Sequence, residues 1–284
     1  MTKTICFYGM ERSGNHATIS WVRNNLPSDN WVFFNNCSRK EFPVDSFSNL
    51  ELRGELIRNR NAEIFDKSME KELSDPNAFD HILVSYEYGS TSPIMLDENT
   101  IDPDAFKTEF GRFDQTVFIV REFLNWLAST YQRQKNRLES QGKAPAGFEM
   151  EPAGKLLLMA INWAKNLEDL KSIQKTGIKN VHVIKYDEWY RSEDYRSSKL
   201  VDLGLPEKSN GLPEFSKYGG GSSFKRTDKS KTPEQRKVTE RFLDLKDDEI
   251  FMSVVKFVLL EKSFKQSLCE FFPQSEDYLE KLGV

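Results

Sequence analysis

The 284-residue sequence predicts a single α/β domain in which a central parallel β-sheet is flanked by helices. Short apolar segments typical of buried strands alternate along the chain with amphipathic segments that have helical spacing. A turn between Gly9 and Gly14 joins the first of these strands to the first helix. The length suits one large domain with a well-buried core, and we find no internal repeat.

The individual elements follow from hydrophobic period and turn residues. The expected strands cover residues 4–8, 31–35, 81–86, 116–120 and 181–185. After the first helix, which follows Gly14, the expected helices cover residues 50–73 with a turn at 59–61, 102–110, 121–138, 153–174 and 188–203. Loops are expected at 36–49 and 139–152, where proline, glycine and polar residues gather. Alternating strands and helices of this kind favour a parallel sheet covered on both faces.

The character of the chain changes near residue 204. Residues 204–232 contain three consecutive glycines and several basic residues, so we expect a flexible basic loop that acts as a lid or as a solvated linker. Residues 233–284 return to helical spacing, and Phe251, Val254 and Val258 form an apolar face. Both segments are interpreted as parts of one domain that spans residues 1–284.

Composition limits the classes of partner. Lys and Arg total 40 against 44 Asp and Glu, a formal net charge of −4, so the chain lacks the overall basic field of a nucleic-acid binder. No apolar run is long enough to cross a membrane, and the first strand starts without a signal-peptide pattern, so we expect a soluble, cytoplasmic protein. The three cysteines and three histidines lack metal-ligand spacing, so we expect reduced cysteines and no metal.

The turn after the first strand is the strongest candidate for a binding site. A helix N-terminus presents unpaired N–H groups and a favourable dipole to an anion. Gly9 and Gly14 have the spacing of a Walker A loop, but Asn15 and His16 replace the Lys and Ser/Thr that such a loop needs. The cation lies within the turn instead, at Arg12, which suits a nucleotide 5′ group bound without Mg²⁺. A turn that serves only strand–helix packing is the alternative.

A second candidate lies where the strand at 116–120 meets the next helix. Arg121 directly follows that strand, and its guanidinium can donate two hydrogen bonds to a phosphate. Ser129 follows about two helical turns later and offers a hydroxyl donor. An ordinary surface arginine at a helix start would have the same local pattern.

These segments resemble the sulfotransferases that use 3′-phosphoadenosine-5′-phosphosulfate (PAPS). Residues 11–16, Glu-Arg-Ser-Gly-Asn-His, look like their 5′-phosphosulfate loop, Pro-Lys-Ser-Gly-Thr-Thr or Pro-Arg-Ser-Gly-Thr-Thr. Residues 117–129 resemble their 3′-phosphate motif, which the resemblance assigns to Arg121 and Ser129. The resemblance also implies that the donor is bound by the loop residues Arg12, Ser13, Gly14, Asn15, His16 and Ala17.

Two further segments resemble the same family less closely. Residues 185–188, Lys-Tyr-Asp-Glu, are similar to a Tyr-Glu-Asp turn whose tyrosine, here Tyr186, lies near the adenine. Residues 222–227 resemble a late Phe-x-Arg-Lys-Gly lid, which implies roles for Phe224, Lys225 and Arg226, although Thr227 stands where glycine is usual. The resemblance spans residues 1 to about 230 and implies a P-loop-NTPase-like sulfotransferase fold.

The general base is expected at Glu87, just beyond the strand at 81–86. In the family a His or Glu at such a position activates the acceptor, and a partly buried carboxylate can accept a proton. A structural ion pair between Glu87 and Arg12 is the alternative. Ser85 stands where a lysine often assists the sulfuryl group, and His16 is the candidate to replace that lysine.

The expected activity is therefore metal-independent, in-line sulfuryl transfer from PAPS to a hydroxyl or amine of a small metabolite or natural product. Adenosine 3′,5′-bisphosphate is the expected second product. A nucleotide or small-molecule kinase on a degenerate P-loop is the alternative enzyme. A non-catalytic module that binds nucleotides or nucleic acid is the third interpretation.

Overall fold

The computed structural model describes residues 2–37, 43–58, 67–75, 77–88, 113–140, 151–213 and 238–284. The helix predicted at 102–110 and most of the loop predicted at 139–152 lie outside the described residues. So does most of the predicted basic lid, with Phe224, Lys225 and Arg226. The described residues therefore do not test these predictions.

The described residues form one seven-stranded sheet with the strand order β4-β3-β2-β5-β1-β6-β7. The strands are β1 (Lys3–Met10), β2 (Trp31–Asn35), β3 (Asn49–Leu52), β4 (Glu55–Arg58), β5 (His81–Tyr88), β6 (Gln115–Val120) and β7 (Val181–Lys185). All neighbouring pairs from β2 to β7 in this order are parallel. The five strands that the sequence predicts are therefore confirmed, and β1 and β5 extend about two residues beyond their predicted ends.

The helical interpretation of residues 50–73 is wrong for residues 49–58. There β3 and β4 form an antiparallel hairpin, and β3 also pairs antiparallel with β2. The two residues between the strands, Arg53 and Gly54, have φ of 49° and 91°, the left-handed values that a two-residue type I′ turn needs. The sheet is therefore mixed, with a parallel centre and an antiparallel edge. Only α3 (Lys67–Ser74) is helical in the described part of this region.

The charge pattern that suggested a helix has a different origin. Glu51 is only 1% exposed, and its carboxylate accepts hydrogen bonds from Arg23 at 2.6 Å. Arg23 belongs to α1 (Asn15–Asn24), which is far from Glu51 in sequence but packs near β3. A buried charge is tolerated when it is paired and hydrogen-bonded, so the sheet hides a residue that looked solvent-exposed.

Helices cover both faces of the sheet, as expected. Alternate residues of β1 separate into two hydrophobic cores, with Ile5 and Phe7 in one and Cys6, Tyr8 and Met10 in the other. The first core includes α1, α7 (Tyr186–Arg191) and α8 (Glu193–Asp202). The second includes α5 (Phe123–Ser140), α6 (Glu151–Thr176), the 3-10 helix η3 (Arg241–Leu245), α9 (Glu249–Leu259), α10 (Lys262–Phe271) and α11 (Ser275–Leu282). The short α2 (Pro43–Ser46) lies within the loop predicted at 36–49.

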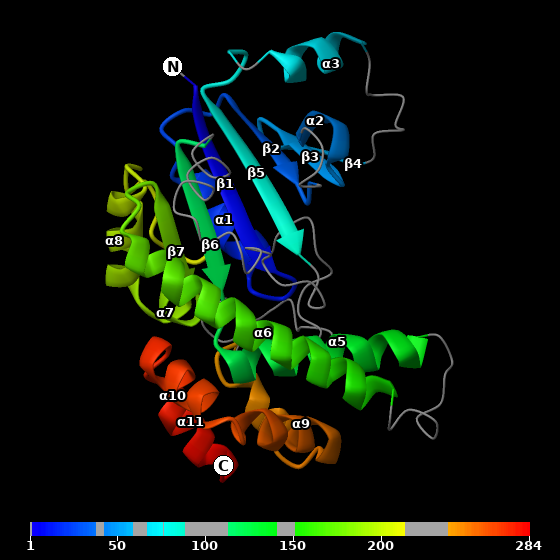
Figure 1. The fold of residues 1–284 in the computed structure, drawn as a ribbon. Coiled ribbons are helices and arrows are strands. Elements are labelled where there is room, and N and C mark those ends of the chain that lie inside the picture. Colours follow the sequence, from blue (N-terminus) through cyan, green and yellow to red (C-terminus); the bar gives the residue numbers. More distant parts are fainter. Residues whose placement is uncertain are drawn as a thin grey trace.

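The C-terminal helices gather at one end of the sheet. Figure 1 shows α9, α10 and α11 beyond the arrowheads of β5 and β6, at the carboxyl ends of the parallel strands. In the described part of the chain, no helix combines the length and the apolar character needed to cross a membrane.

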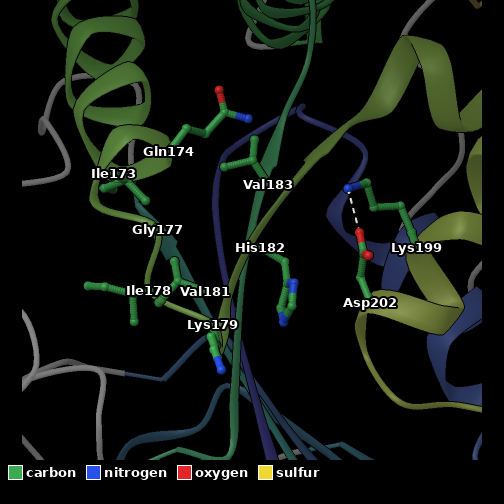
Figure 2. Close-up of a pocket in the computed structure, with 10 residues that line it drawn as sticks. All are labelled: Ile173, Gln174, Gly177, Ile178, Lys179, Val181, His182, Val183, Lys199 and Asp202. Carbon is green, nitrogen blue, oxygen red and sulfur yellow. Dashed lines mark hydrogen bonds and ion pairs between the residues drawn. The ribbon is translucent and has the colours of Figure 1, made fainter.

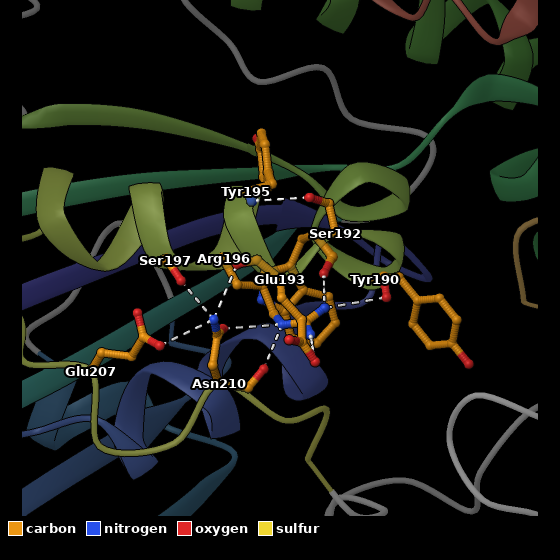
Figure 3. Close-up of polar contacts among 9 residues, drawn as sticks. Tyr190, Ser192, Glu193, Tyr195, Arg196, Ser197, Glu207 and Asn210 are labelled. Atoms are coloured by element: carbon orange, nitrogen blue, oxygen red, sulfur yellow. Dashed lines mark hydrogen bonds and ion pairs between the residues drawn. The ribbon is translucent and has the colours of Figure 1, made fainter.

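The predicted helix at 188–203 is divided in two at Ser192, whose hydroxyl accepts a hydrogen bond from Tyr195 N and so caps α8. Arg196 then ties this region together, as Figure 3 shows. Its guanidinium is 4% exposed and donates to the carbonyl oxygens of Trp189, Tyr190 and Asn210. These bonds hold α7 against the segment that leads away from α8.

Candidate functional site

The predicted site residues come together at the carboxyl edge of the sheet. Glu87 lies beside Gly9 in the register of β1 and β5, while Arg121 and Tyr186 directly follow β6 and β7. Arg12 lies two residues beyond the end of β1. Because β1 is flanked by β5 on one side and β6 on the other, the loop after β1 occupies the part of a parallel sheet where ligands commonly bind.

The loop between β1 and α1 has an unusual backbone. Arg12 has φ of 71° and Gly14 has φ of 93°, both in the left-handed region that L-residues seldom adopt. Gly14 is the N-cap of α1, so no side chain caps this helix, and its carbonyl accepts from Ala17 N and Thr18 N at 3.1 Å. The buried Ser13 closes the turn by donating its N–H to the Met10 carbonyl at 3.1 Å. No side chain therefore caps the first N–H groups of α1.

Gly14 also has a steric role. A Cβ atom at this position would lie 2.1 Å from the ring of Tyr186, so the close approach of the ring excludes any larger residue. Tyr186 is 8% exposed, and the Arg121 guanidinium lies 5.4 Å from the centre of its ring. The residue that the sequence associates with adenine therefore lies between the β1–α1 loop and Arg121.

Helix α5 holds the loop in place through three of its side chains. Trp126 donates to the Glu11 carbonyl at 2.9 Å, and Arg133 pairs with the Glu11 carboxylate at 2.5 Å. Arg12 Nε donates to Ser129 Oγ at 3.3 Å. The two motifs that the sequence singled out are thus in direct contact. Ser129, predicted to meet a 3′-phosphate, orients the loop arginine in this structure, and Arg133 is a contributor that the sequence analysis missed.

Arg121 is buried, at 4% exposure, so the surface-arginine alternative is wrong. Its Nη1 donates to the Arg12 carbonyl at 3.4 Å, and its Nη2 donates to the Val238 carbonyl. The third nitrogen, Nε, is buried and has no hydrogen-bond partner among the described residues. A buried donor without a partner is costly, so this nitrogen is a candidate to contact a ligand.

Glu87 is half-buried and receives a hydrogen bond from Asn15 Nδ2 at 3.2 Å. Burial and the nearby Glu11 raise the pKa of Glu87, and this rise is opposed by the bond from Asn15 and by the charges of Arg133 and Arg12. Asn15, which stands where a Walker lysine would be, therefore tethers the candidate base. Arg12 acts on Glu87 through its charge, and the hydrogen bond comes from Asn15.

His16 is the second residue of α1. Burial and then the positive charge of Arg12 lower the pKa of His16 below its ordinary value. The imidazole is therefore neutral near pH 7 and is able to accept a proton. Both Glu87 and His16 keep the chemical character that a general base needs.

The structure adds Arg241, from η3, to this cationic cluster. Burial, followed by the charges of Arg121 and Arg12, lowers the pKa of Arg241 to about 10. Burial and the charges of Arg121 and Arg133 lower the pKa of Arg12 to about 10 as well. Arg241 lies in a C-terminal segment whose local pattern is that of an ordinary helix, so the sequence offers no signal for its position near Arg12.

Two carboxylates lie buried beneath the arginines. Glu122 and Asp187 are both fully buried, and the N–H of Glu122 donates to Asp187 Oδ2 at 2.7 Å. Glu122 Oε2 accepts from Asn125 N and Nδ2 at 3.0 and 3.2 Å, and Oε1 accepts from Ser275 Oγ at 3.0 Å. Burial and the neighbouring Asp187 raise the pKa of Glu122 to about 7. Burial also raises the pKa of Asp187, against the opposing charge of Arg121.

A separate hollow of about 400 Å³ lies at the other end of β7 (Figure 2). Its lining includes Gly177, Lys179 and His182 but none of the predicted site residues. Among its polar groups, Lys199 pairs with Asp202 at 2.8 Å, and His182 contacts Gln115 at 2.5 Å. We assign no ligand to this hollow.

Comparison with models of known protein families and with curated proteins finds no match for this chain. The residues and the geometry described above are therefore the basis for a function.

Proposed function

We propose that the protein is a sulfotransferase that moves a sulfuryl group from PAPS to a hydroxyl or amine of a small molecule, on a P-loop-NTPase-like sulfotransferase fold. The observation that carries this proposal is the contact between the two predicted motifs. Arg12 donates to Ser129 and accepts from Arg121, although these residues are more than a hundred positions apart. The loops after β1 and β6 meet because these strands are parallel neighbours, and there the two motifs place their arginines together at the edge of the sheet where ligands commonly bind.

The residues present fit a donor with several anionic groups. Repulsion among neighbouring guanidinium groups contributes to the lowered pKa values of Arg12 and Arg241, and a bound polyanion relieves such repulsion. Arg121 Nε is a buried donor without a partner in the described structure. The uncapped start of α1 adds N–H groups that favour negative charge. PAPS carries the sulfuryl group to be transferred and two separate phosphate positions, which match this set of donors.

In the proposed reaction, Glu87 accepts the proton of the acceptor hydroxyl or amine. The acceptor atom forms a bond to sulfur, and the bond between sulfur and the oxygen of the 5′-phosphate breaks, so adenosine 3′,5′-bisphosphate leaves with that oxygen. Arg12 and the first N–H groups of α1 stabilise the charge on the departing oxygen, a contribution of roughly 3 kcal/mol per donor. The raised pKa of Glu87 suits a group that takes up a proton and later returns it to water.

In this proposal Arg121, Ser129 and the lid residues Phe224, Lys225 and Arg226 serve the 3′-phosphate and adenine side of the donor, with Tyr186. The side chain of Asn15 argues against the kinase alternative, because it is bonded to Glu87 and to the Gly9 and Met10 carbonyls and carries no charge for a triphosphate. The net charge of −4 argues against a nucleic-acid module.

Thermal unfolding with a panel of ligands tests the proposal. Adenosine 3′,5′-bisphosphate in the presence of EDTA should raise the midpoint temperature, by a stabilisation of about 2.7 kcal/mol at a concentration 100 times Kd. Stabilisation by ATP only with Mg²⁺ would indicate a kinase, and salt-dependent binding of oligonucleotides would indicate a nucleic-acid module. Either result without an effect of the bisphosphate would overturn the proposal.

The acceptor is then sought by incubating the protein with PAPS and a library of small metabolites and natural products. Mass spectrometry should detect a product heavier by one sulfuryl group, formed in the presence of EDTA. A protein that binds adenosine 3′,5′-bisphosphate but sulfates a peptide or glycan in place of a small molecule would correct the proposed acceptor class.

A further inference from the structure

The start of η3 and the residues just before it are anchored by side chains of Arg121, Asn125 and Arg191. Arg121 donates to the Val238 carbonyl, and Arg191 Nε donates to Thr239 Oγ1 at 3.3 Å. Asn125 makes two hydrogen bonds to this segment. Its Nδ2 donates to the Thr239 carbonyl at 2.8 Å, and its Oδ1 accepts from Arg241 N at 3.2 Å. Residues 238–241 therefore have a defined position relative to α5 and α7.

Asn125 is the centre of this anchor. It is fully buried, and its Nδ2 also lies within hydrogen-bond distance of Glu122 Oε2 at 3.2 Å and Asp187 Oδ1 at 3.3 Å. The buried carboxylates orient the amide, so its oxygen faces the N–H of Arg241. A buried polar network with its members satisfied fixes a unique geometry, which a chain of apolar contacts would not do as strictly.

This anchoring has a consequence for the anion site. Arg121 contacts the Val238 carbonyl, and Arg241 follows three residues later with its N–H on Asn125, so Arg241 lies within electrostatic reach of Arg121 and Arg12. Bringing a third guanidinium to two others costs free energy, and the surrounding burial increases that cost. Such an arrangement is favoured when an anion joins the cluster.

We propose that Arg241 is a ligand-binding residue that recognises the second phosphate of a nucleotide carrying two separate phosphate groups, and that Asn125 is the residue that positions it. This inference rests on the proposed function. It makes Arg241 the residue that discriminates a bisphosphorylated nucleotide from a monophosphorylated one. Arg12 and the start of α1 then serve the 5′ group, while Arg241 acts with Arg121 on the other phosphate.

Isothermal titration with adenosine 3′,5′-bisphosphate and with adenosine 5′-monophosphate tests the role of Arg241. Arg241→Gln should weaken binding of the bisphosphate by about 10- to 100-fold, the loss expected for one charge-assisted contact. Its effect on the monophosphate should be less than about threefold by the same reasoning. Arg241→Lys should recover part of the loss, because lysine keeps the charge but lacks the planar fork. The matched control is Lys246→Gln, an exposed cation just after η3.

A double-mutant cycle tests the positioning role of Asn125. Asn125→Ser should weaken bisphosphate binding, and it should add little loss when Arg241 is already Gln, because both changes remove the same contact. Additive losses would overturn the positioning role. Should Asn125→Ser fail to fold, the pair Arg241→Gln and Arg241→Lys still decides the binding role.

The two proposals fail in different ways. A parent protein that binds adenosine 3′,5′-bisphosphate, with an Arg241→Gln variant that binds it equally well, overturns the inference and leaves the proposed function standing. A parent protein that does not bind the bisphosphate overturns both.

Discussion

Replacing Glu122 with glutamine should change how stability depends on pH. The carboxyl group of Glu122 is fully buried against Asp187, and its pKa in the folded protein is about 7, well above the ordinary 4.5. Between these two values the folded protein keeps a proton that the unfolded chain has already lost. Stability should therefore fall as pH rises from about 4.5 to 7 and then level off.

The magnitude follows from the two pKa values. Each pKa unit corresponds to about 1.4 kcal/mol, so the separation between 4.5 and about 7 corresponds to roughly 3 kcal/mol of unfolding free energy. Glutamine removes this ionisation but keeps the shape, with an oxygen that can accept from Asn125 and an amide that can donate to Ser275 Oγ. The raised pKa of Asp187 remains, so a smaller decline persists in the variant.

The assay is urea unfolding at pH 5, 6, 7 and 8, followed by fluorescence of the buried tryptophans. The difference in unfolding free energy between Glu122→Gln and the parent should shift in favour of the variant by roughly 2 to 3 kcal/mol from pH 5 to pH 8. Glu280→Gln, on the exposed face of α11, is the matched control and should follow the parent. A Glu122→Gln variant with the parent's pH dependence would refute the reasoning, because Glu122 would then be ionised in the folded protein throughout.

Three further predictions concern the loop and the candidate base. Arg12→Ala should lower kcat by about 100-fold, more than it weakens binding of adenosine 3′,5′-bisphosphate, and an unchanged turnover would contradict its assignment. Glu87→Gln should lower kcat/KM by about 10²- to 10⁴-fold and remove the rise of kcat/KM with pH that its raised pKa produces in the parent; a variant that keeps this rise would make His16 the base. Gly14→Ala should destabilise the protein by more than the roughly 1–2 kcal/mol of a left-handed alanine, because its Cβ would also displace the Tyr186 ring. Gly54→Ala, with φ of 91° and open space around its Cβ, isolates the backbone contribution in the same urea titration, and equal losses would contradict the role of the ring.

Local sequence patterns were enough to predict the central architecture. Five buried strands and the long helices after them have periods and turn residues that act over a few positions, so they can be read without knowledge of distant contacts. The same holds for Arg121, which directly follows a predicted strand, and for Arg12, which lies in the turn after another, because parallel strands bring their carboxyl ends to one edge. The loop at Gly14 was predictable for a similar reason, since a tight strand-to-helix turn needs its left-handed residue.

Tertiary structure alone decided the features that depend on partners far away in the sequence. Residues 50–58 have a charge pattern that fits a helix, yet β3 pairs with β2 and β4 pairs with β3, and Arg23 neutralises the Glu51 that this pairing buries. Arg241 lies near the cationic cluster through contacts such as that of its N–H with Asn125, more than a hundred residues earlier. Local periodicity records which side of an element faces the core, but it does not record which buried polar groups satisfy one another. The chain must fold before those pairs, and the pKa values that they set, come into existence.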